Sequence, residues 1–376
     1  MIIAVNANFI NTGPGNAACF IFEKFSRLAS QYPQHQFVYI SDKAIDEKNI
    51  ISKNITPVVT GPQTKNPLLL QYWLNYKVPA ILRRYKADVF VSAGGYCSLR
   101  TKVPQCIIIN DLSFLQHPDF FAAGWLRFYK KNTTKFLTKA KTIVTTSQFL
   151  ELEIINTYKI ESSKVDVVYQ SAGEYFKPVI WQQKDVTKAN YTEGKEYFLY
   201  SGPIAPDKNL ITLLKAFSFF KKRQKSNMQL VLASKTAVTD KGFIKNLASF
   251  KYRDEVKLFE NLPPDGLAEI TASAYAMIYP LVYEAVGTSL IEAMQAGVPV
   301  ISAGTTAIPE ICGDAALYFN SGDFNDIADK MMFLFKDEDQ RNQHIIKGRQ
   351  QAGLYNWHKT LEVLWAAIGK CADSLN

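Results

Sequence analysis

The sequence has 376 residues, of which 47% are hydrophobic and 20% are charged. This length is too great for one ordinary core and suits two domains of a soluble, globular chain. No apolar run reaches the roughly 18 residues that a membrane span requires. The five cysteines form no CxxC pair and the four histidines show no metal-ligand spacing. We therefore expect reduced thiols, a cytoplasmic protein and no metal site.

The net charge of +9 is concentrated in the first half of the chain. Residues 1–173 carry 20 basic and 11 acidic side chains, whereas residues 174–376 carry 23 of each. Two stretches, 71–86 and 125–141, interleave aromatic and basic residues as interfacial helices do. They suit either a solvated helix face or an anionic partner such as lipid headgroups. No nucleic-acid-binding motif accompanies them, so nucleic acid is not an expected partner.

Short β-branched runs alternate with helical patterns along the chain. The opening "MIIAVNANFI" lacks the basic region and cleavage site of a signal peptide, so it predicts a first strand. In the first half, strands are expected at 2–8, 36–41, 55–60, 87–92, 105–110, 142–147 and 165–170. In the second half they are expected at 197–202, 228–233, 255–259, 276–280, 298–302 and 316–319. With helical periodicity between them, as at 209–224, these runs predict two parallel α/β sheets covered by helices.

The domain organisation follows from one polar interruption. Residues 174–195 are polar and contain a proline, which predicts a linker between two doubly wound, Rossmann-like domains at 1–173 and 196–354. Two such domains would face each other across a cleft at the carboxyl ends of their strands, where ligands bind in open α/β sheets. A last helix is expected at 355–376.

A glycine-rich loop, "NTGPGNAA" at 11–18, separates the first strand from a predicted helix. Gly13 and Gly15 lack GxGxxG spacing, which weakens the case for nucleotide binding there. Contact with an acceptor or a phosphate and a simple strand-to-helix turn both fit this loop.

The stretch "YEAVGTSLIEAMQAGVPVIS" at 283–302 places two acids around a small-residue turn. Thr288 or Ser289 can cap the helix that follows, and the free amides and dipole at that helix end suit a phosphate. Glu284 before the turn and Glu292 within the helix can each accept hydrogen bonds from a vicinal diol. The pattern predicts a sugar–diphosphate–nucleoside ligand. The alternative is a strand–loop–helix unit with incidental surface glutamates.

The same stretch resembles the E-x7-E motif of retaining GT-B glycosyltransferases, in particular the group 1 type of family 4. The shared residues are Glu284, Gly287, Leu290, Glu292, Ala293, Met294, Gly297, Pro299, Val300 and Ile301. The resemblance continues through "IIINDLSFLQHPDFF" (107–121), 142–173, "YFLYSGPIAPDKNLITLLKAF" (197–217) and "LYNWHKTLEVL" (354–364). It implies the GT-B fold, with an acceptor-binding domain at 1–173, a nucleotide-sugar donor domain at 196–354 and a last helix that crosses back onto the N-terminal domain.

The resemblance also implies roles for particular residues. Glu292 would hold the ribose hydroxyls and Glu284 the donor sugar. Lys208, in the same loop as Gly202, would neutralise the leaving diphosphate in place of a metal, so no metal or other cofactor is expected. The diphosphate would be held by the backbone amides of Gly287, Thr288, Ser289 and Leu290.

Three features depart from the family pattern, one of which is Glu284-Ala285-Val286-Gly287 in place of E-G-F-G, with Glu260 at the family's usual glycine. Pro203 and Asp207 stand where the family places an arginine, and Asp207 must point away from the diphosphate or pair with Lys208. Lys235 could supply the missing cation or be a solvated lysine at a strand end. Asn110 replaces a histidine, and its neighbour Asp111 would orient substrate or cap the following turn.

The leading hypothesis is a retaining, metal-independent glycosyltransferase. It would move a mannose-like sugar from a GDP- or UDP-linked donor to a glycan or lipid-linked glycan in surface polysaccharide synthesis, at the inner face of the plasma membrane. The alternative is a non-catalytic GT-B-like subunit that binds a glycan or a partner transferase. A GT-B phosphorylase is less favoured because no lysine resembles a pyridoxal site. A GT-B epimerase is less favoured because epimerases differ in their acid and histidine pattern.

Overall fold

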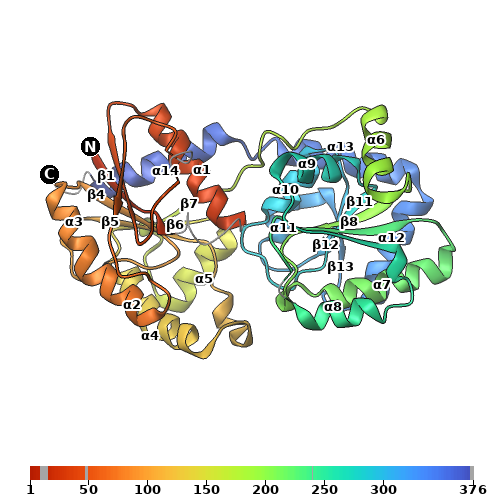
Figure 1. The fold of residues 1–376 in the computed structure, drawn as a ribbon, viewed down its shortest axis with the longest axis horizontal. Coiled ribbons are helices and arrows are strands. Elements are labelled where there is room, and N and C mark those ends of the chain that lie inside the picture. Colours follow the sequence, from red (N-terminus) through yellow and green to blue (C-terminus); the bar gives the residue numbers. More distant parts are fainter. Residues whose placement is uncertain (9–15, 47–49, 239, 373–376) are drawn as a thin grey trace. The chain divides into compact units, whose positions relative to one another are not determined.

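The computed structural model describes residues 1–8, 16–46, 50–238 and 240–372, without the side chains of 16–22. The chain divides into two compact units (Figure 1). The first comprises Met1–Tyr169 with Trp357–Asn376, and the second comprises Gln170–Asn356. Each unit is built on one parallel sheet, so the expected α/β architecture is confirmed. None of the described helices is long and apolar enough to cross a bilayer.

The sheet of the first unit has the strand order β3-β2-β1-β4-β5-β6-β7. Its strands are β1 Ile2–Asn6, β2 Gln36–Ser41, β3 Ile55–Val59, β4 Val89–Ala93, β5 Gln105–Ile109, β6 Thr142–Thr145 and β7 Val165–Val167. Its longer helices are α1 Asn16–Gln31, α2 Pro67–Tyr72, α3 Val78–Arg84, α4 Ala123–Lys139, α5 Gln148–Tyr158 and α14 Trp357–Ala372. A π-helical segment, η3 Trp73–Lys77, joins α2 to α3. The chain runs from β1 to β2 and β3 on one side and returns to β4 on the other, so the order reverses between β1 and β4.

The core of the first unit explains why these runs form strands. Every residue of β4 and β5 is buried, as expected for parallel strands that helices cover on both faces. Helix α14 contributes Leu361, Leu364 and Ile368 to this core. Trp365 of α14 also stacks on Tyr32, with ring centroids 3.8 Å apart. The last helix of the chain is therefore part of the unit that contains the first strand.

The sheet of the second unit has the order β10-β9-β8-β11-β12-β13, which reverses between β8 and β11. Its strands are β8 Tyr197–Ser201, β9 Gln229–Ala233, β10 Val256–Phe259, β11 Ala276–Tyr279, β12 Val300–Ala303 and β13 Ala316–Phe319. Its helices are α6 Trp181–Thr192, α7 Leu210–Gln224, α8 Lys241–Ala248, α9 Pro264–Ser273, α10 Thr288–Gln295, α11 Ile308–Cys312, α12 Phe324–Lys336 and α13 Glu338–Ala352. Helices α9, α10 and α13 lie on one face of the sheet, and α7, α8 and α12 lie on the other (Figure 1). All the strands expected from the sequence are present in the described residues of the two units.

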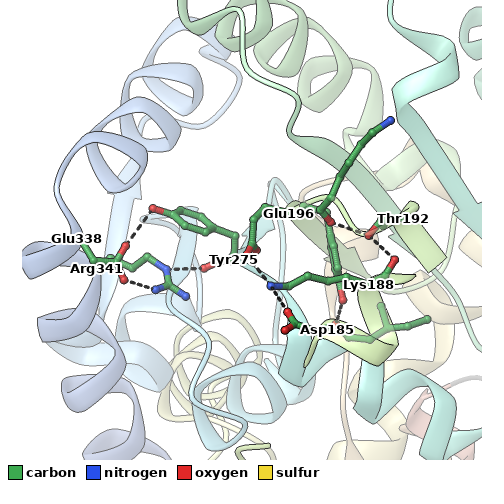
Figure 2. Close-up of polar contacts among 10 residues, drawn as sticks. Asp185, Lys188, Thr192, Glu196, Tyr275, Glu338 and Arg341 are labelled. Atoms are coloured by element: carbon green, nitrogen blue, oxygen red, sulfur yellow. Dashed lines mark hydrogen bonds and ion pairs between the residues drawn. The ribbon is translucent and has the colours of Figure 1, made fainter. Parts of the chain in front are cut away.

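The segment 174–195 differs from the expected linker. It contains α6, which belongs to the second unit and packs against α9. Lys188 forms ion pairs with Glu196 at 2.5 Å and with Asp185 at 3.8 Å, and the Thr192 hydroxyl donates to the carbonyl of Lys188 (Figure 2). These bonds join the helix to the start of β8. The division between the two units falls at 169/170 and 356/357.

Candidate functional site

The two sheets each offer a natural binding edge where the strand order reverses. Ligands of open α/β sheets bind at such points, outside the carboxyl ends of the strands. In the second unit the loops after β8, β9 and β11 meet this edge. In the first unit the loops after β1 to β5 do so. The two edges carry different side chains and are described separately.

The loop after β8 holds Lys208 in a short 3-10 turn, Pro206–Lys208. The Lys208 ammonium lies 2.5 Å from the Asp207 carboxylate. Of the two arrangements expected, in which Asp207 points away from the diphosphate or pairs with Lys208, the structure shows the ion pair. Asn209, with a left-handed φ of 56°, ends the turn. The Nδ2 of its side chain donates to the Pro280 carbonyl after β11. The loop is therefore tied to the neighbouring strand end.

Gly202, at the start of that loop, is required by close packing. A Cβ at this position would lie 2.8 Å from the Tyr200 hydroxyl oxygen, which donates to the carbonyl of Pro203. A side chain here would therefore displace Tyr200 or the loop.

The Glu284 carboxylate is bound on both of its oxygens. The Tyr279 hydroxyl, at the end of β11, donates to Oε2 at 2.5 Å. The backbone amides of Val286 and Gly287 donate to Oε1 at 2.8 and 3.1 Å. Burial, together with the Glu284 charge, raises the pKa of the Tyr279 hydroxyl well above its usual value, so it stays protonated and remains a donor. Glu284 is therefore held in one orientation by its own loop.

Helix α10 begins at Thr288, after Gly287 with a left-handed φ of 72°. Of the four amides expected to hold a diphosphate, Gly287 donates to Glu284 and Leu290 donates to the Gly287 carbonyl. Thr288 and Ser289 supply the first two helical amides, which lack acceptors within a helix. They are the better candidates for an anion.

Glu292 lies in the first turns of α10 and is only 4% exposed. Its Oε1 is 3.7 Å from the Lys235 ammonium, which follows β9 and lies over the Phe176 ring, 5.8 Å from the centroid. From the sequence, Lys235 was either a substitute cation or a solvated lysine at this strand end. The structure shows it beside Glu292, whereas Lys208 is beside Asp207.

The first unit has a cavity of about 700 Å³, open on one side, at the carboxyl ends of its strands. Its polar lining includes Asn8, Asp42, Thr64, Asn110 and Asp111. Its aromatic lining comprises Tyr96, Phe114, Phe121, Trp125 and Tyr129. This volume falls within the range of small-molecule sites.

Asn110 and Asp111 both line the cavity. The Asp111 carboxylate accepts a 2.5 Å hydrogen bond from the Ser113 amide, which is the turn-capping role considered from the sequence. The Asn110 Oδ1 is buried and has no hydrogen-bond partner among the described residues. An amide oxygen in this state favours a ligand or water donor.

The site residues expected from the sequence thus divide between the two units, except for two glycines that lie outside the described residues. Lys208, Lys235, Glu284 and Glu292 lie in the second unit, with Gly202 and the start of α10. Asn110 and Asp111 lie in the first. Gly13 and Gly15 lie outside the described residues. The described chain contains no group of His, Cys, Asp or Glu side chains arranged to hold a metal ion.

Sequence reasoning missed two residues that shape the site. Tyr279 looked like an ordinary strand aromatic, and only its position five residues before Glu284 hinted at the contact. Asn209 looked like part of a helix start, whereas its amide bonds to the Pro280 carbonyl. An asparagine directly before a helix ordinarily caps that helix, and Asn209 forms no such cap, so the sequence carried no signal for the bridge.

Comparison with known proteins relates this chain to glycosyltransferases. Residues 182–351 match the sequence profile described as "Glycosyl transferases group 1". The chain is 24% identical over 277 residues to O-antigen chain mannosyltransferase B of Escherichia coli, covering 73% of this chain and 72% of that one. It is 26% identical over 235 residues to O-antigen chain mannosyltransferase RfbU of Salmonella typhimurium, covering 60% and 61%. It also aligns with 31% of the length of serotype-specific mannosyltransferase WbdA of Escherichia coli.

Solved structures share the fold over nearly the whole chain. The glycosyltransferase WaaG, involved in lipopolysaccharide biosynthesis, superposes with a TM-score of 0.78 at 14% identity, covering 98% of both chains. Sucrose-phosphate synthase from Thermosynechococcus elongatus gives 0.78 at 15% identity, covering 97% of this chain and 98% of that one. Anabaena HepE, in complex with UDP and glucose, gives 0.74 at 14% identity, covering 98% and 99%. These likenesses confirm the expected GT-B fold.

Proposed function

We propose, from the premise that this chain is a GT-B glycosyltransferase whose residues 182–351 form a group 1 domain, that it transfers a hexose from a nucleotide sugar. The acceptor would be a glycan or lipid-linked glycan in surface polysaccharide synthesis. The observation that carries the proposal is the group formed after β8, β9 and β11. There, the carboxylates of Asp207, Glu284 and Glu292, two lysines and the N-terminus of α10 come from neighbouring strand ends of one sheet.

Mannose is the first choice of donor sugar, and GDP the first choice of nucleotide. The support is the printed function of the relatives, three of which are mannosyltransferases by name. UDP-linked sugars are the second choice, because a solved neighbour holds UDP.

Each group in the donor site has a distinct task. Glu292 accepts hydrogen bonds from the ribose hydroxyls, and Glu284, held by Tyr279, accepts one from the sugar. The Thr288 and Ser289 amides at the start of α10 bind phosphate oxygens. Lys208 stabilises the negative charge that develops on the diphosphate, which is the largest catalytic effect expected here.

The transfer we propose retains the anomeric configuration. The acceptor hydroxyl oxygen bonds to the anomeric carbon on the face from which the diphosphate departs. The bond between that carbon and the phosphate oxygen breaks, and its electron pair passes to the oxygen. The acceptor proton moves to the same oxygen. Lys208 can stabilise the leaving group in place of a metal ion once its ammonium turns from Asp207.

Product analysis tests this proposal. The full chain is incubated with GDP-mannose or a UDP-hexose, an α-mannoside acceptor and a metal chelator, and the product is examined by NMR. We expect a new α-linkage in the presence of the chelator. A β-linked product would refute retention, loss of activity on chelation would refute metal independence, and no product with any donor would refute transfer.

The second candidate is a GT-B-like subunit without catalytic activity. The ion pair between Lys208 and Asp207 favours it, because the lysine that should meet the diphosphate is already neutralised. This candidate predicts that Glu292→Ala scarcely changes nucleotide affinity. The transferase proposal predicts that Glu292→Ala weakens it by at least tenfold.

We also propose that the first unit associates with an anionic membrane surface. The side chains of Leu68, Tyr72 and Tyr76, on α2 and η3, are 79%, 45% and 49% exposed, and Arg100 lies over the Tyr76 ring. Exposed aromatics beside basic residues suit a headgroup region. Flotation with phosphatidylglycerol vesicles should carry the protein at low salt, less so at high salt, and less so for Tyr72→Ser/Tyr76→Ser. Protein that stays entirely in the soluble fraction at low salt would contradict the proposal.

A further inference from the structure

The loop after β12, residues 304–307, adjoins the donor site without contributing a charged group to it. It joins β12 to α11, and β12 is the neighbour of β11 in the sheet (Figure 1). The loop therefore lies beside the chain that carries Glu284. We infer that Thr306 of this loop is a positioning residue, which fixes the backbone of Glu284 so that the carboxylate meets the donor sugar. The inference rests on the proposed function, in which Glu284 binds that sugar.

The loop binds both polar groups of the Glu284 backbone. The Glu284 amide donates to the Thr306 hydroxyl oxygen at 3.0 Å, and the Glu284 carbonyl accepts from the Ala307 amide at 3.1 Å. The Thr306 hydroxyl in turn donates to the Thr305 carbonyl at 2.8 Å, so it acts as donor and acceptor at once. The Thr305 hydroxyl donates to the Val282 carbonyl at 3.3 Å. The loop after β12 is therefore fastened to the loop after β11 at Val282 and at Glu284.

Thr306 has a backbone conformation that threonine ordinarily avoids. Its φ is 57°, in the left-handed region, and it is the one β-branched residue with a positive φ in the described part of the chain. Such a conformation persists only where the surrounding structure imposes it. Glycine would adopt it without strain, but glycine has no hydroxyl to accept from Glu284. Thr306 thus supplies a hydrogen-bond acceptor at a point where the backbone alone favours glycine.

A fixed backbone at Glu284 completes the hold on its side chain. The Tyr279 hydroxyl and the amides of Val286 and Gly287 already bind the two carboxylate oxygens. Thr306 fixes the main-chain end of the same residue. A side chain held at both ends needs little reorganisation when it meets a sugar hydroxyl. Loss of the Thr306 hydroxyl should therefore slow sugar transfer and leave the binding of the free diphosphate unchanged.

Steady-state kinetics of the full chain with GDP-mannose or a UDP-hexose and an α-mannoside acceptor test this inference. Thr306→Gly removes the hydroxyl, and kcat should fall about fivefold, as expected for loss of one hydrogen bond. Thr306→Ser keeps the hydroxyl and should restore most of the rate. The affinity for GDP or UDP, measured by calorimetry, should be the same in both variants and the wild type, which also shows that they are folded. Lys225→Gly is the matched control and should leave kcat unchanged, because Lys225 also has a left-handed φ, of 50°, but ends α7.

Chemical denaturation separates the hydroxyl from the backbone conformation. Thr306→Ala loses the hydroxyl and keeps a side chain in the left-handed region, whereas Thr306→Gly loses the hydroxyl and relieves the strain. The glycine variant should therefore unfold at a denaturant concentration no lower than that of the alanine variant. A lower midpoint for Thr306→Gly than for Thr306→Ala would overturn the inference.

The kinetic outcomes separate this inference from the proposed function. No transfer by the wild type with either class of donor would refute the proposed function and this inference with it. Transfer by the wild type with an unchanged kcat in Thr306→Gly would overturn the inference alone, as would an equal loss in Thr306→Ser. A loss of GDP or UDP affinity that matches the loss of kcat would also overturn it, because Thr306 would then support the whole donor site and not Glu284.

Discussion

The strand order reverses in the same way in both units, but the side chains that gather at the two reversals differ in kind. In the second unit, the edge between β8 and β11 gathers charged groups that already contact one another, Lys208 with Asp207 and Lys235 with Glu292. In the first unit, the edge between β1 and β4 opens on a cavity of aromatic rings and hydrogen-bonding groups whose charges cancel. The comparison shows that the sheet supplies the location of a site while the loops decide its chemistry.

The loops differ for a physical reason. After β11 the chain turns sharply at Gly287 and starts α10, so amides and a helix dipole meet the edge. After β5 the chain instead runs through the two short 3-10 turns Ser113–Leu115 and Pro118–Phe120 before α4. That longer path brings Phe114 and Phe121 against Tyr129. The first loop suits a phosphate and the second suits an apolar ring face.

The largest effect is expected from removing the Lys208 ammonium in the second unit. Lys208→Met should lower kcat for sugar transfer by about 10²–10³-fold, because charge on the leaving diphosphate loses its stabilisation. Steady-state kinetics with saturating donor measures this. Lys235→Met is the control, and an equal loss there would show that the two lysines cannot be assigned different roles.

The next effect concerns the residue that positions Glu284. Tyr279→Phe removes the hydroxyl that donates to Oε2 and leaves the ring, so transfer should fall about tenfold, as expected for loss of a hydrogen bond to a charged group. Affinity for the free nucleoside diphosphate, which lacks the sugar, should not change. A loss of diphosphate affinity would show that Tyr279 supports the loop as a whole. Tyr200→Phe is a matched buried tyrosine for comparison.

A smaller effect, and a gain instead of a loss, is expected from breaking the ion pair between Asp207 and Lys208. Asp207→Asn releases Lys208 from its carboxylate, so the affinity for GDP or UDP should rise by a few-fold. Calorimetric titration at low ionic strength gives the largest difference. Unchanged or weaker binding would show that Asp207 orients Lys208 productively.

The last prediction concerns stability in the first unit. Burial lowers the pKa of the Lys24 ammonium in α1 to about 7, whereas an unfolded lysine titrates near 10.4. Between these values the unfolded chain binds more protons, so stability should rise with pH, by roughly 2 kcal/mol between pH 7 and pH 9. Lys24→Met should flatten this dependence in chemical denaturation. A rise of the same size in the variant would refute it.

Much of the fold could be predicted because its strands are short apolar runs, and those inside each sheet, such as β4, β5, β8 and β9, are buried along their whole length. Helix α6 could not, since Trp181–Thr192 is mostly polar and buries only Thr187 and Thr192. Its stability comes from tertiary bonds such as that between Lys188 and Glu196, which leave no periodic pattern.

The sequence predicted which residues form the candidate site better than it predicted the hydrogen bonds between them. The spacing of Glu284 and Glu292 indicated a donor site, but spacing does not show which hydrogen bonds the loop forms with itself. The capture of Glu284 by Tyr279 and by two amides depends on the path of the chain after β11. Similarly, the aromatics of 125–141 gave no sign of facing a cavity, because that depends on packing against Phe114 and Phe121.

Nucleotide titration of the full chain tests the central claim most directly. Calorimetry with GDP, UDP and their hexose conjugates compares wild type, Glu292→Ala and Trp125→Leu, with circular dichroism to verify folding. We predict sub-millimolar binding of at least one nucleotide, weakened at least tenfold by Glu292→Ala and unaffected by Trp125→Leu. The absence of sub-millimolar binding, or equal affinity in wild type and Glu292→Ala, would contradict it.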